Sequence, residues 1–138
     1  MDEIILRGHK VAKGKVEGEA LVSHQSFHFL HQVDTKTGLV IGKDNEWEGM
    51  NIAGKILVFP LGKGSTACAY ALYEMARCGT QPKGIINLRA DPVLAVGAVI
   101  SNIPMIDRLD GNPIDLIKTG DYVELDADQG TVKIRARG

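Results

Sequence analysis

The segment GKGST, at residues 62–66, combines residue types that can bind and act on an anion. Its two glycines allow a sharp turn and a close approach of the backbone to a ligand. The helix expected after it directs unpaired N–H groups toward the loop, Lys63 adds a charge, and Ser65 and Thr66 add hydroxyl groups. The sequence therefore predicts an anion site. The alternative is structural, with Ser65 or Thr66 capping the helix and the glycines only turning the chain.

Two known phosphate-binding motifs do not account for this loop. A Walker A motif requires a glycine five residues before its Gly-Lys pair, whereas this position is Leu57. The Rossmann fingerprint could match only through Gly62, Gly64 and Ala67, and Asp91 lies further on than the acid expected after about 20 residues. The loop is therefore a poor match to both nucleotide-binding motifs.

Arg89 and Asp91 form a second polar group. They follow the strand-like run GIINL at 84–88, and α/β sheets bind ligands at the carboxyl ends of parallel strands. Arg89 could therefore hold a carboxylate, and a solvated loop arginine is the alternative. Asp91 precedes Pro92, an arrangement typical of an N-cap and the first residue of a helix.

Three histidines, His24, His28 and His31, have the spacing of one helix face, on which they could bind a metal ion. The surrounding sequence SHQSFHFLHQVD, at 23–34, also suits a strand or a loop, because phenylalanine and leucine interleave with the histidines. The alternative, which we favour, is that these histidines are exposed or packed without a metal.

The two cysteines, Cys68 and Cys78, fall on one predicted helix. Ten residues of helix span about 15 Å, well beyond the roughly 7 Å between Cα atoms that a disulfide tolerates. The cysteines can therefore neither form a disulfide nor share a metal or cluster within this chain. We interpret them as small buried hydrophobic residues.

Short apolar runs between glycines and polar turns predict strands, and apolar residues every three or four positions predict helices. Strands are predicted at 3–8, 18–23, 37–42, 55–60, 84–88 and 103–107, and helices at 66–79 and 92–101. A helical or turn segment at 114–118 precedes a hairpin of strands at 122–127 and 131–137. The alternation in the middle predicts an α/β fold with a parallel βαβαβ core and flanking β-strands.

The predicted helix at 92–101 carries no polar side chain between Val93 and Ile100. A helix that is apolar on every side is normally buried on every side. A crossover helix in so small a domain keeps one face in water, so something extra is expected to cover it. Either a partner subunit or the domain's own loops and second sheet layer could do so.

Length and composition indicate one folded domain over residues 1–138. The hydrophobic share of 44% and the charged share of 24% are those of a globular protein. A net charge of −1 without a basic block argues against nucleic acid and anionic membranes as partners. The longest uncharged stretch, 92–106, is shorter than the roughly 18 residues of a membrane span, and the N-terminus lacks secretory organisation. We therefore expect a cytoplasmic protein.

Several segments together resemble the small subunit, or swivel domain, of aconitase X-type hydro-lyases. They are GKVEGEALVS, FLHQVDTKTG, NIAGKILVFPLGKGST, PKGIINLRADPVLAVGAVISNIPMID and KTGDYVELDADQGTVKI, and they cover nearly the whole chain. The resemblance implies a swivelling β/β/α domain. It also implies pairing with a large subunit that carries an iron or iron-sulfur centre, so that this chain itself binds no cofactor or metal.

The same resemblance implies dehydration of a small hydroxy acid, with mevalonate 5-phosphate and cis-3-hydroxy-L-proline as candidate substrates. The family's catalytic serine stands in a G-[KR]-G-S-[ST] loop, which assigns the base to Ser65. The remaining loop residues and the arginine of the next strand end are expected to bind substrate: Gly62, Lys63, Gly64, Thr66 and Arg89. A stand-alone anion-binding or regulatory swivel domain without catalysis is the alternative function.

Overall fold

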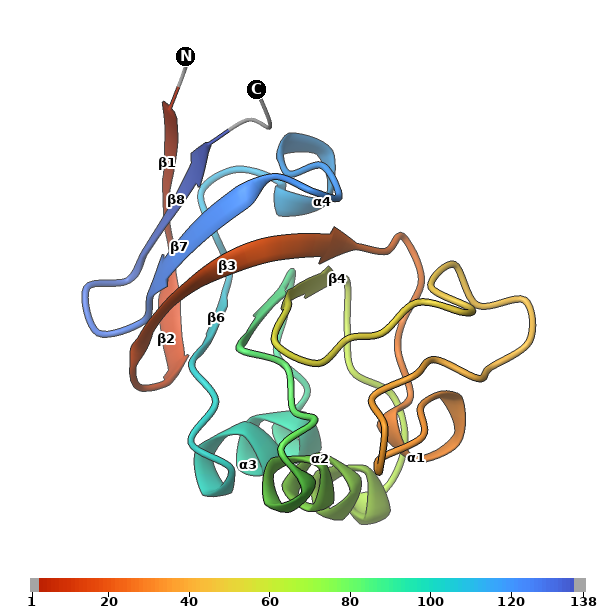
Figure 1. Cartoon of the computed structure of the whole chain (residues 1–138). Helices are drawn as coiled ribbons and strands as arrows, with labels where there is room; N and C mark the ends of the chain where they lie inside the picture. The colour runs from red at the N-terminus through yellow and green to blue at the C-terminus, as the bar shows by residue number, and fades with distance from the viewer. Residues whose placement is uncertain (1–2, 136–138) are drawn as a thin grey trace.

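Strand β3 (Lys15–Val22) bends from one sheet into another and thereby organises the fold (Figure 1). The computed structural model of the chain describes residues 3–135. The first part of β3 pairs antiparallel with β7 (Tyr122–Asp126), and its last three residues pair parallel with β4 (Ile56–Phe59). One strand therefore belongs to both sheets and joins them.

The first sheet is antiparallel and contains both ends of the described chain. β1 (Glu3–Arg7) pairs with β8 (Thr131–Arg135), which pairs with β7, which pairs with β3. The predicted C-terminal hairpin is confirmed by the β7–β8 pair. Residues 136 and 137 of the predicted second strand lie outside the described residues.

The second sheet provides the predicted parallel core. β3, β4, β5 (Gly84–Asn87) and β6 (Met105–Asp107) are parallel neighbours, and β2 (His9–Ala12) adds an antiparallel edge beside β6. Helices α2 (Thr66–Cys78) and α3 (Pro92–Ile100) connect β4 to β5 and β5 to β6. The predicted α/β class and the βαβαβ core are therefore confirmed.

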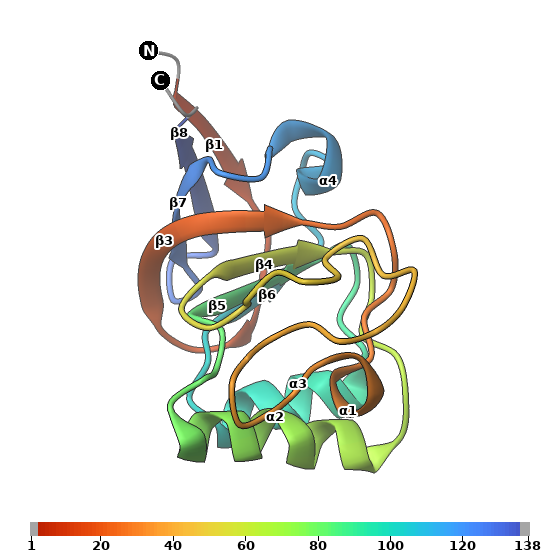
Figure 2. The same ribbon diagram turned by 45° about the vertical axis from the view of Figure 1, so that its right-hand side comes forward.

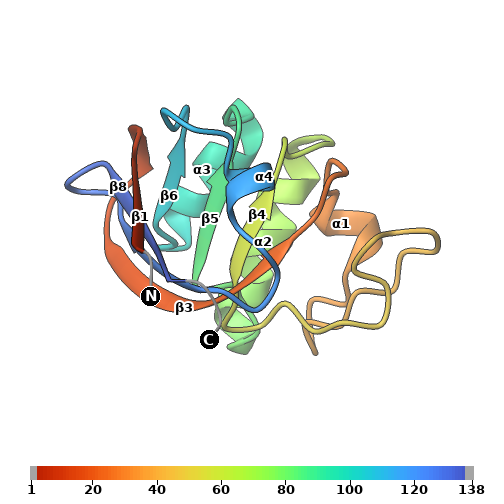
Figure 3. The same ribbon diagram turned by 90° about the horizontal axis from the view of Figure 1, so that it is seen from above.

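The layers follow the order β, β, α. Figure 2 shows α2 and α3 together on one face of the parallel sheet, with the short α1 (Phe29–Gln32) beside them. Figure 3 shows α4 (Pro113–Leu116) on the opposite side of the sheet, so the predicted helical segment at 114–118 is confirmed. Among residues 3–135, no helix has both the length and the apolar character that a bilayer crossing requires.

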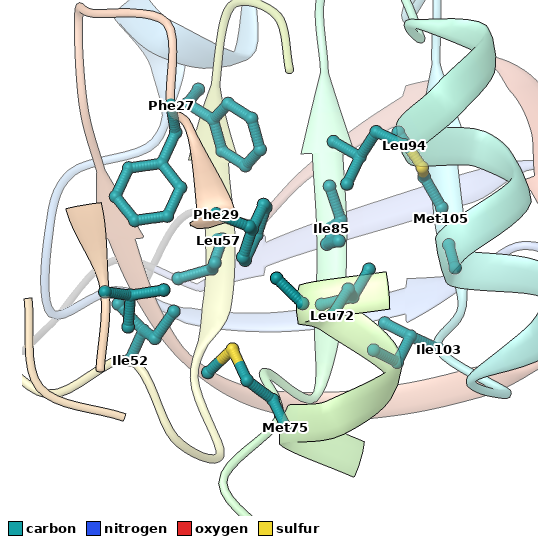
Figure 4. Close-up of a cluster of buried hydrophobic side chains, with 14 of the residues drawn as sticks. Phe27, Phe29, Ile52, Leu57, Leu72, Met75, Ile85, Leu94, Ile103 and Met105 are labelled. Atoms are coloured by element: carbon teal, nitrogen blue, oxygen red, sulfur yellow. The ribbon is translucent and has the colours of Figure 1, made fainter. Parts of the chain in front are cut away.

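Alternate side chains of the parallel strands fill two separate cores, as both faces of a parallel sheet must be covered. Leu57 and Ile85 point into the core beneath the helices, where they meet Leu72, Met75 and other side chains drawn in Figure 4. The other face of the sheet packs on the antiparallel sheet through a second set of buried residues, which includes Ile56, Val58, Ile86, Val123 and Ile134. The carboxyl ends of β4 and β5 are thus held rigidly from both sides.

The predicted strand at 37–42 is wrong. Leu39 forms an isolated bridge with Asn51, and Val40 forms one with Val33, so no single neighbouring strand runs beside the segment. The amides of Ile41 and the next residue both donate to the carbonyl of Gln32 instead. The apolar run therefore belongs to a loop whose hydrogen bonds go to several partners, and the short strand β2 is an element that the sequence did not predict.

The predicted apolar stripe of α2 is confirmed, because Cys68, Ala71, Leu72 and Met75 are buried. The prediction for Cys78 is wrong, since this residue is exposed at the last turn of the helix. Its thiol donates to a carboxylate oxygen of Glu74 at 3.7 Å rather than entering the core. Both cysteines are free.

Candidate functional site

The GKGST loop is held at the carboxyl end of β4 by a second loop of the chain. The amide of Phe27 donates to the carbonyl of Leu61 at 3.2 Å, and the amide of Lys63 donates to the carbonyl of Phe27 at 3.0 Å. These bonds form a parallel bridge between Phe27 and Gly62. Because Phe27 is buried among Phe29, Trp47 and Phe59, the bridge fixes the loop to the core.

The two glycines of the loop permit two different close contacts. A Cβ atom on Gly62 would lie 2.6 Å from Cδ2 of Leu94, so glycine lets α3 approach the loop. Gly64 has a φ of +121°, and a Cβ there would lie 2.4 Å from Sγ of Cys68 and 2.6 Å from Nε2 of His28. The loop thus lies directly against two side chains that sequence analysis had not connected with it.

Ser65 is the N-cap of α2 and is exposed. Its Oγ accepts a hydrogen bond from the amide of Ala67 at 3.4 Å, so the capping role considered from the sequence is present. Thr66 is the first helical residue and is also exposed. An N–H that donates to Oγ, at the positive end of the helix, favours negative charge on that oxygen. Capping and an activated hydroxyl are therefore compatible roles for Ser65.

His28 lies against the loop through several contacts. It is the N-cap of α1, and its Nδ1 accepts a hydrogen bond from the amide of His31 at 3.3 Å. The two imidazole rings stack with their centroids 4.6 Å apart. Sγ of Cys68 lies 3.5 Å from Nδ1 of His28 and donates to the carbonyl of Lys63 at 3.4 Å. His28 therefore contacts both His31 and the first turn of α2, which Cys68 ties to the backbone of Lys63.

The electrostatic surroundings of His28 disfavour its charged form. Partial burial lowers the pKa of His28 most, the nearby His31 and Lys63 lower it further, and a backbone hydrogen bond at His28 itself opposes the shift. The net direction is downward from the usual value of about 6.5. The imidazole is therefore mainly neutral at neutral pH, with one donor nitrogen and one acceptor nitrogen.

An open hollow of about 540 Å³ is lined by the histidine loop and, from the GKGST loop, by Lys63. Small-molecule sites commonly occupy a few hundred to about 1,000 Å³. The lining consists almost wholly of polar residues, namely Gln25, Ser26, His28, His31, Gln32, Asp44 and Lys63. Only Gly64 separates Lys63 from Ser65 along the chain, although Ser65 itself does not line the hollow.

Arg89 lies at the end of the neighbouring strand, as the sequence predicted. It is exposed, and its amide approaches the carbonyl of Pro60 at 3.5 Å. Asp91 accepts a hydrogen bond from the amide of Leu94 at 3.1 Å and is the N-cap of α3, which confirms its predicted role. Arg89 does not line the polar hollow, so the structure places it on the same sheet edge but in a different part of the site.

The predicted common helix face of the three histidines does not form. α1 contains only four residues, and His24 lies outside it, with Nδ1 3.1 Å from a carboxylate oxygen of Glu46. Within residues 3–135, no group of three His, Cys, Asp or Glu side chains could hold a metal ion. The ring of His24 instead lies beside Glu46, and the rings of His28 and His31 stack on each other.

A family comparison connects this geometry with known proteins. The family model described as the aconitase X swivel domain matches residues 5–134. The chain belongs to this family. The resemblance inferred from the sequence segments is thereby confirmed, together with the swivel-domain fold that it implied.

Curated relatives of this swivel domain are dehydratase subunits. The phosphomevalonate dehydratase small subunit of Methanocella arvoryzae is 44% identical over 94% of this chain and 98% of its own length. The phosphomevalonate dehydratase small subunit of Thermococcus kodakarensis is 45% identical over 96% of this chain and 98% of its own length. The crystal structure of Thermococcus kodakaraensis aconitase X in its holo-form is 44% identical, with a TM-score of 0.91 over 96% of this chain and 99% of that chain.

The swivel domain also presents an apolar surface beside the loop. A groove of about 250 Å³ is lined by Thr66, Ala69, Pro92, Val93 and Val96. On the same helix, Val96 and Val99 are 56% and 55% exposed, so the prediction that α3 is buried on every side is wrong for the chain alone. Of the two coverings considered, the domain's own loops and sheets do not cover Val96 and Val99 within residues 3–135.

Proposed function

We propose that this chain is the small subunit of an aconitase X-type dehydratase that removes water from phosphomevalonate. The observation that carries the proposal is the exposed Ser65 at the N-terminus of α2, two positions after Lys63, which lines a hollow together with two histidines. Family membership and the names of the curated relatives support it. A cytoplasmic location, expected from the sequence, is part of the same proposal.

Ser65 is proposed as the base of the reaction. The oxygen of Ser65 would take the proton from the carbon beside the substrate carboxylate. The electron pair of that C–H bond would form the carbon–carbon double bond while the C–O bond of the neighbouring carbon breaks. The departing hydroxide would take up one proton to leave as water, and Ser65 would release the proton it gained before the next turnover. The donated hydrogen bond from Ala67, the helix N-terminus and Lys63 would all stabilise the deprotonated oxygen of Ser65.

The other residues of the loop are proposed to bind the substrate. Gly62 and Gly64 would contribute backbone groups of a loop that packs against Leu94, Cys68 and His28. Lys63 and Thr66 offer a charge and a hydroxyl group. Arg89 on the neighbouring strand end would bind the carboxylate. If Lys63 binds phosphate, Lys63→Ala will raise KM more for a phosphorylated than for an unphosphorylated substrate.

The active site is proposed to be completed by a large subunit. Such a subunit would cover the exposed face of α3 and the apolar groove, whose lining includes Thr66. Because Thr66 follows Ser65, the same contact would exclude water from Ser65. We expect the iron or iron-sulfur centre on that subunit, because the two cysteines of this chain occupy opposite ends of α2. When bound, a metal centre of this kind supplies a Lewis acid for the leaving hydroxyl.

Co-expression with the large subunit of the same genome tests this proposal. The purified complex should dehydrate phosphomevalonate, detected by mass spectrometry as the loss of one water. cis-3-Hydroxy-L-proline should react poorly, because it has no phosphate group for Lys63 to bind. Failure to form any complex, or turnover of hydroxyproline alone, would overturn the proposed function and favour the stand-alone anion-binding domain.

A further inference from the structure

The polar hollow contains donor groups that the proposed chemistry at Ser65 does not use. Lys63 contributes a positive charge, and the imidazoles of His28 and His31 lie in the same wall. Asp44 is the one acidic residue of the lining among the residues that the structure describes. The groups that can donate hydrogen bonds or carry positive charge therefore outnumber the acid, which favours an anionic ligand.

The orientation of His28 determines which of its nitrogen atoms can act on a ligand. Nδ1 accepts from the amide of His31, so a neutral ring carries its proton on Nε2. Nε2 lies only 2.6 Å from the position of a Cβ on Gly64. Because Gly64 has no side chain, this donor nitrogen reaches the loop directly next to Ser65.

The side chains around the two histidines hold the loop in place. The amide of His28 donates to Oε1 of Gln32 at 2.7 Å. Gln25 accepts from the amide of Glu46 at 2.9 Å and donates to the carbonyl of Asp44 at 3.3 Å. The histidine loop is thus positioned by its own hydrogen bonds before a ligand enters, and such preorganisation reduces the entropic cost of binding.

We infer that this hollow binds the phosphate group of the substrate, with His28, His31 and Lys63 as its recognition residues. The inference rests on the proposed function, since it concerns the substrate on which Ser65 would act. Ser65 lies two positions after Lys63, and two residues of extended chain span at most about 7 Å. A short carbon chain in the substrate can therefore join a phosphate near Lys63 to a reacting carbon near Ser65.

A phosphate group fits this cluster better than a second carboxylate does. A phosphate monoester carries up to two negative charges and three terminal oxygens, so it is best satisfied by several donors converging from different directions. Lys63 and the paired imidazoles of His28 and His31 come from two loops that are bridged through Phe27. Arg89, outside the hollow, remains available for the carboxylate at the other end of the substrate.

Steady-state kinetics of the complex with the large subunit provide the first test. His31→Ala and His28→Asn should each raise KM for phosphomevalonate about tenfold or more with little change in kcat, because each removes a charge-assisted donor. Asparagine is chosen at position 28 because it preserves the N-cap of α1. His24→Ala, on the same loop but outside the hollow, should leave KM unchanged.

Nuclear magnetic resonance of the full-length chain provides a test that does not depend on turnover. Inorganic phosphate and phosphomevalonate should both shift the ring signals of His28 and His31 in a saturable way, whereas mevalonate should not. The ring signals of His24 should not move. Equal shifts of all three histidines, or no saturable shift, would overturn the inference.

The two tests separate the inference from the proposed function. If the complex dehydrates phosphomevalonate and both histidine variants keep a KM within twofold of the wild type, the inference is overturned and the proposed function stands. If the complex shows no dehydratase activity, the proposed function is overturned. The ring signals of the three histidines then decide whether the hollow binds phosphate.

Discussion

The sulfur of Cys68 lies 3.5 Å from Nδ1 of His28, although 40 residues separate the two along the chain. The same sulfur donates to the carbonyl of Lys63. Through the buried Cys68, the first turn of α2 is therefore attached both to the GKGST loop and to the N-cap of α1. Through this contact the two loops behave as one structural unit.

Gly64→Ala should disrupt this unit. Its φ of +121° disfavours any side chain, and the new methyl group would collide with Cys68 and His28. We expect the free energy of unfolding to fall by about 1–3 kcal/mol or more, and the activity of the complex to fall with it. Chemical denaturation measures the first effect and the dehydration assay the second.

Gly49→Ala is the matched control for this substitution. Gly49 also has a positive φ, of +83°, but a Cβ there meets nothing within 4 Å. It should lose stability through backbone strain alone, by about 1–2 kcal/mol, while the complex keeps its activity. If Gly64→Ala were as active as Gly49→Ala, close packing at the loop would not matter for function.

The stability of the chain should depend on the titration of His28. Burial, followed by His31 and Lys63, lowers the pKa of His28 in the folded state, so the unfolded chain binds this proton more tightly. His28 therefore makes its full contribution to stability above about pH 6.5, the pKa of a histidine in the unfolded chain. This contribution is lost as the pH falls from that value toward the lower pKa of the folded state. Urea unfolding of the wild type and of His28→Asn on either side of this pH measures the difference.

The variant should lose less stability on acidification than the wild type does. Equal losses in the wild type and in His28→Asn would show that His28 does not contribute to this dependence.

Local sequence patterns were sufficient to predict most of the fold. The stripe of α2, the Asp91–Pro92 start of α3 and the C-terminal hairpin are encoded by neighbouring residues, and all three are confirmed. The segment 37–42 was misinterpreted because an apolar run gives no information about whether a partner strand is present. The short β2 has no strong alternation of its own, and its pairing with β6 is a tertiary contact.

The candidate site was only partly predictable. The residues of the GKGST loop were found from their types and spacing, which are local properties. The contact of His28 with Cys68 depends on the backbone bridge between Phe27 and Gly62, and no local pattern in the sequence reports that bridge. The histidines were therefore considered apart from the loop, as a possible metal site or, as favoured, as exposed or packed residues, and Cys68 was considered only as a core residue.

Val96→Asp should separate folding from assembly. Val96 is exposed and lines the apolar groove, so a charge there leaves the core intact while placing a carboxylate on the proposed docking surface. We expect an unfolding midpoint close to that of the wild type and loss of the large subunit during co-purification.

Ile5→Asp is a comparable charge insertion on a different face. Ile5 is similarly exposed but lies on β1, in the antiparallel sheet. This variant should still co-purify with the large subunit. Retention of the large subunit by Val96→Asp would place the docking surface elsewhere.

The kcat of the assembled dehydratase with Ser65 replaced tests the central claim most directly. Ser65→Ala removes both the cap and the hydroxyl, whereas Ser65→Asn keeps a capping side chain without the hydroxyl. If Ser65 is the base, both complexes should form normally, and kcat for phosphomevalonate should fall by about 10²–10⁴-fold in each. A kcat within twofold of the wild type in either complex would contradict the claim.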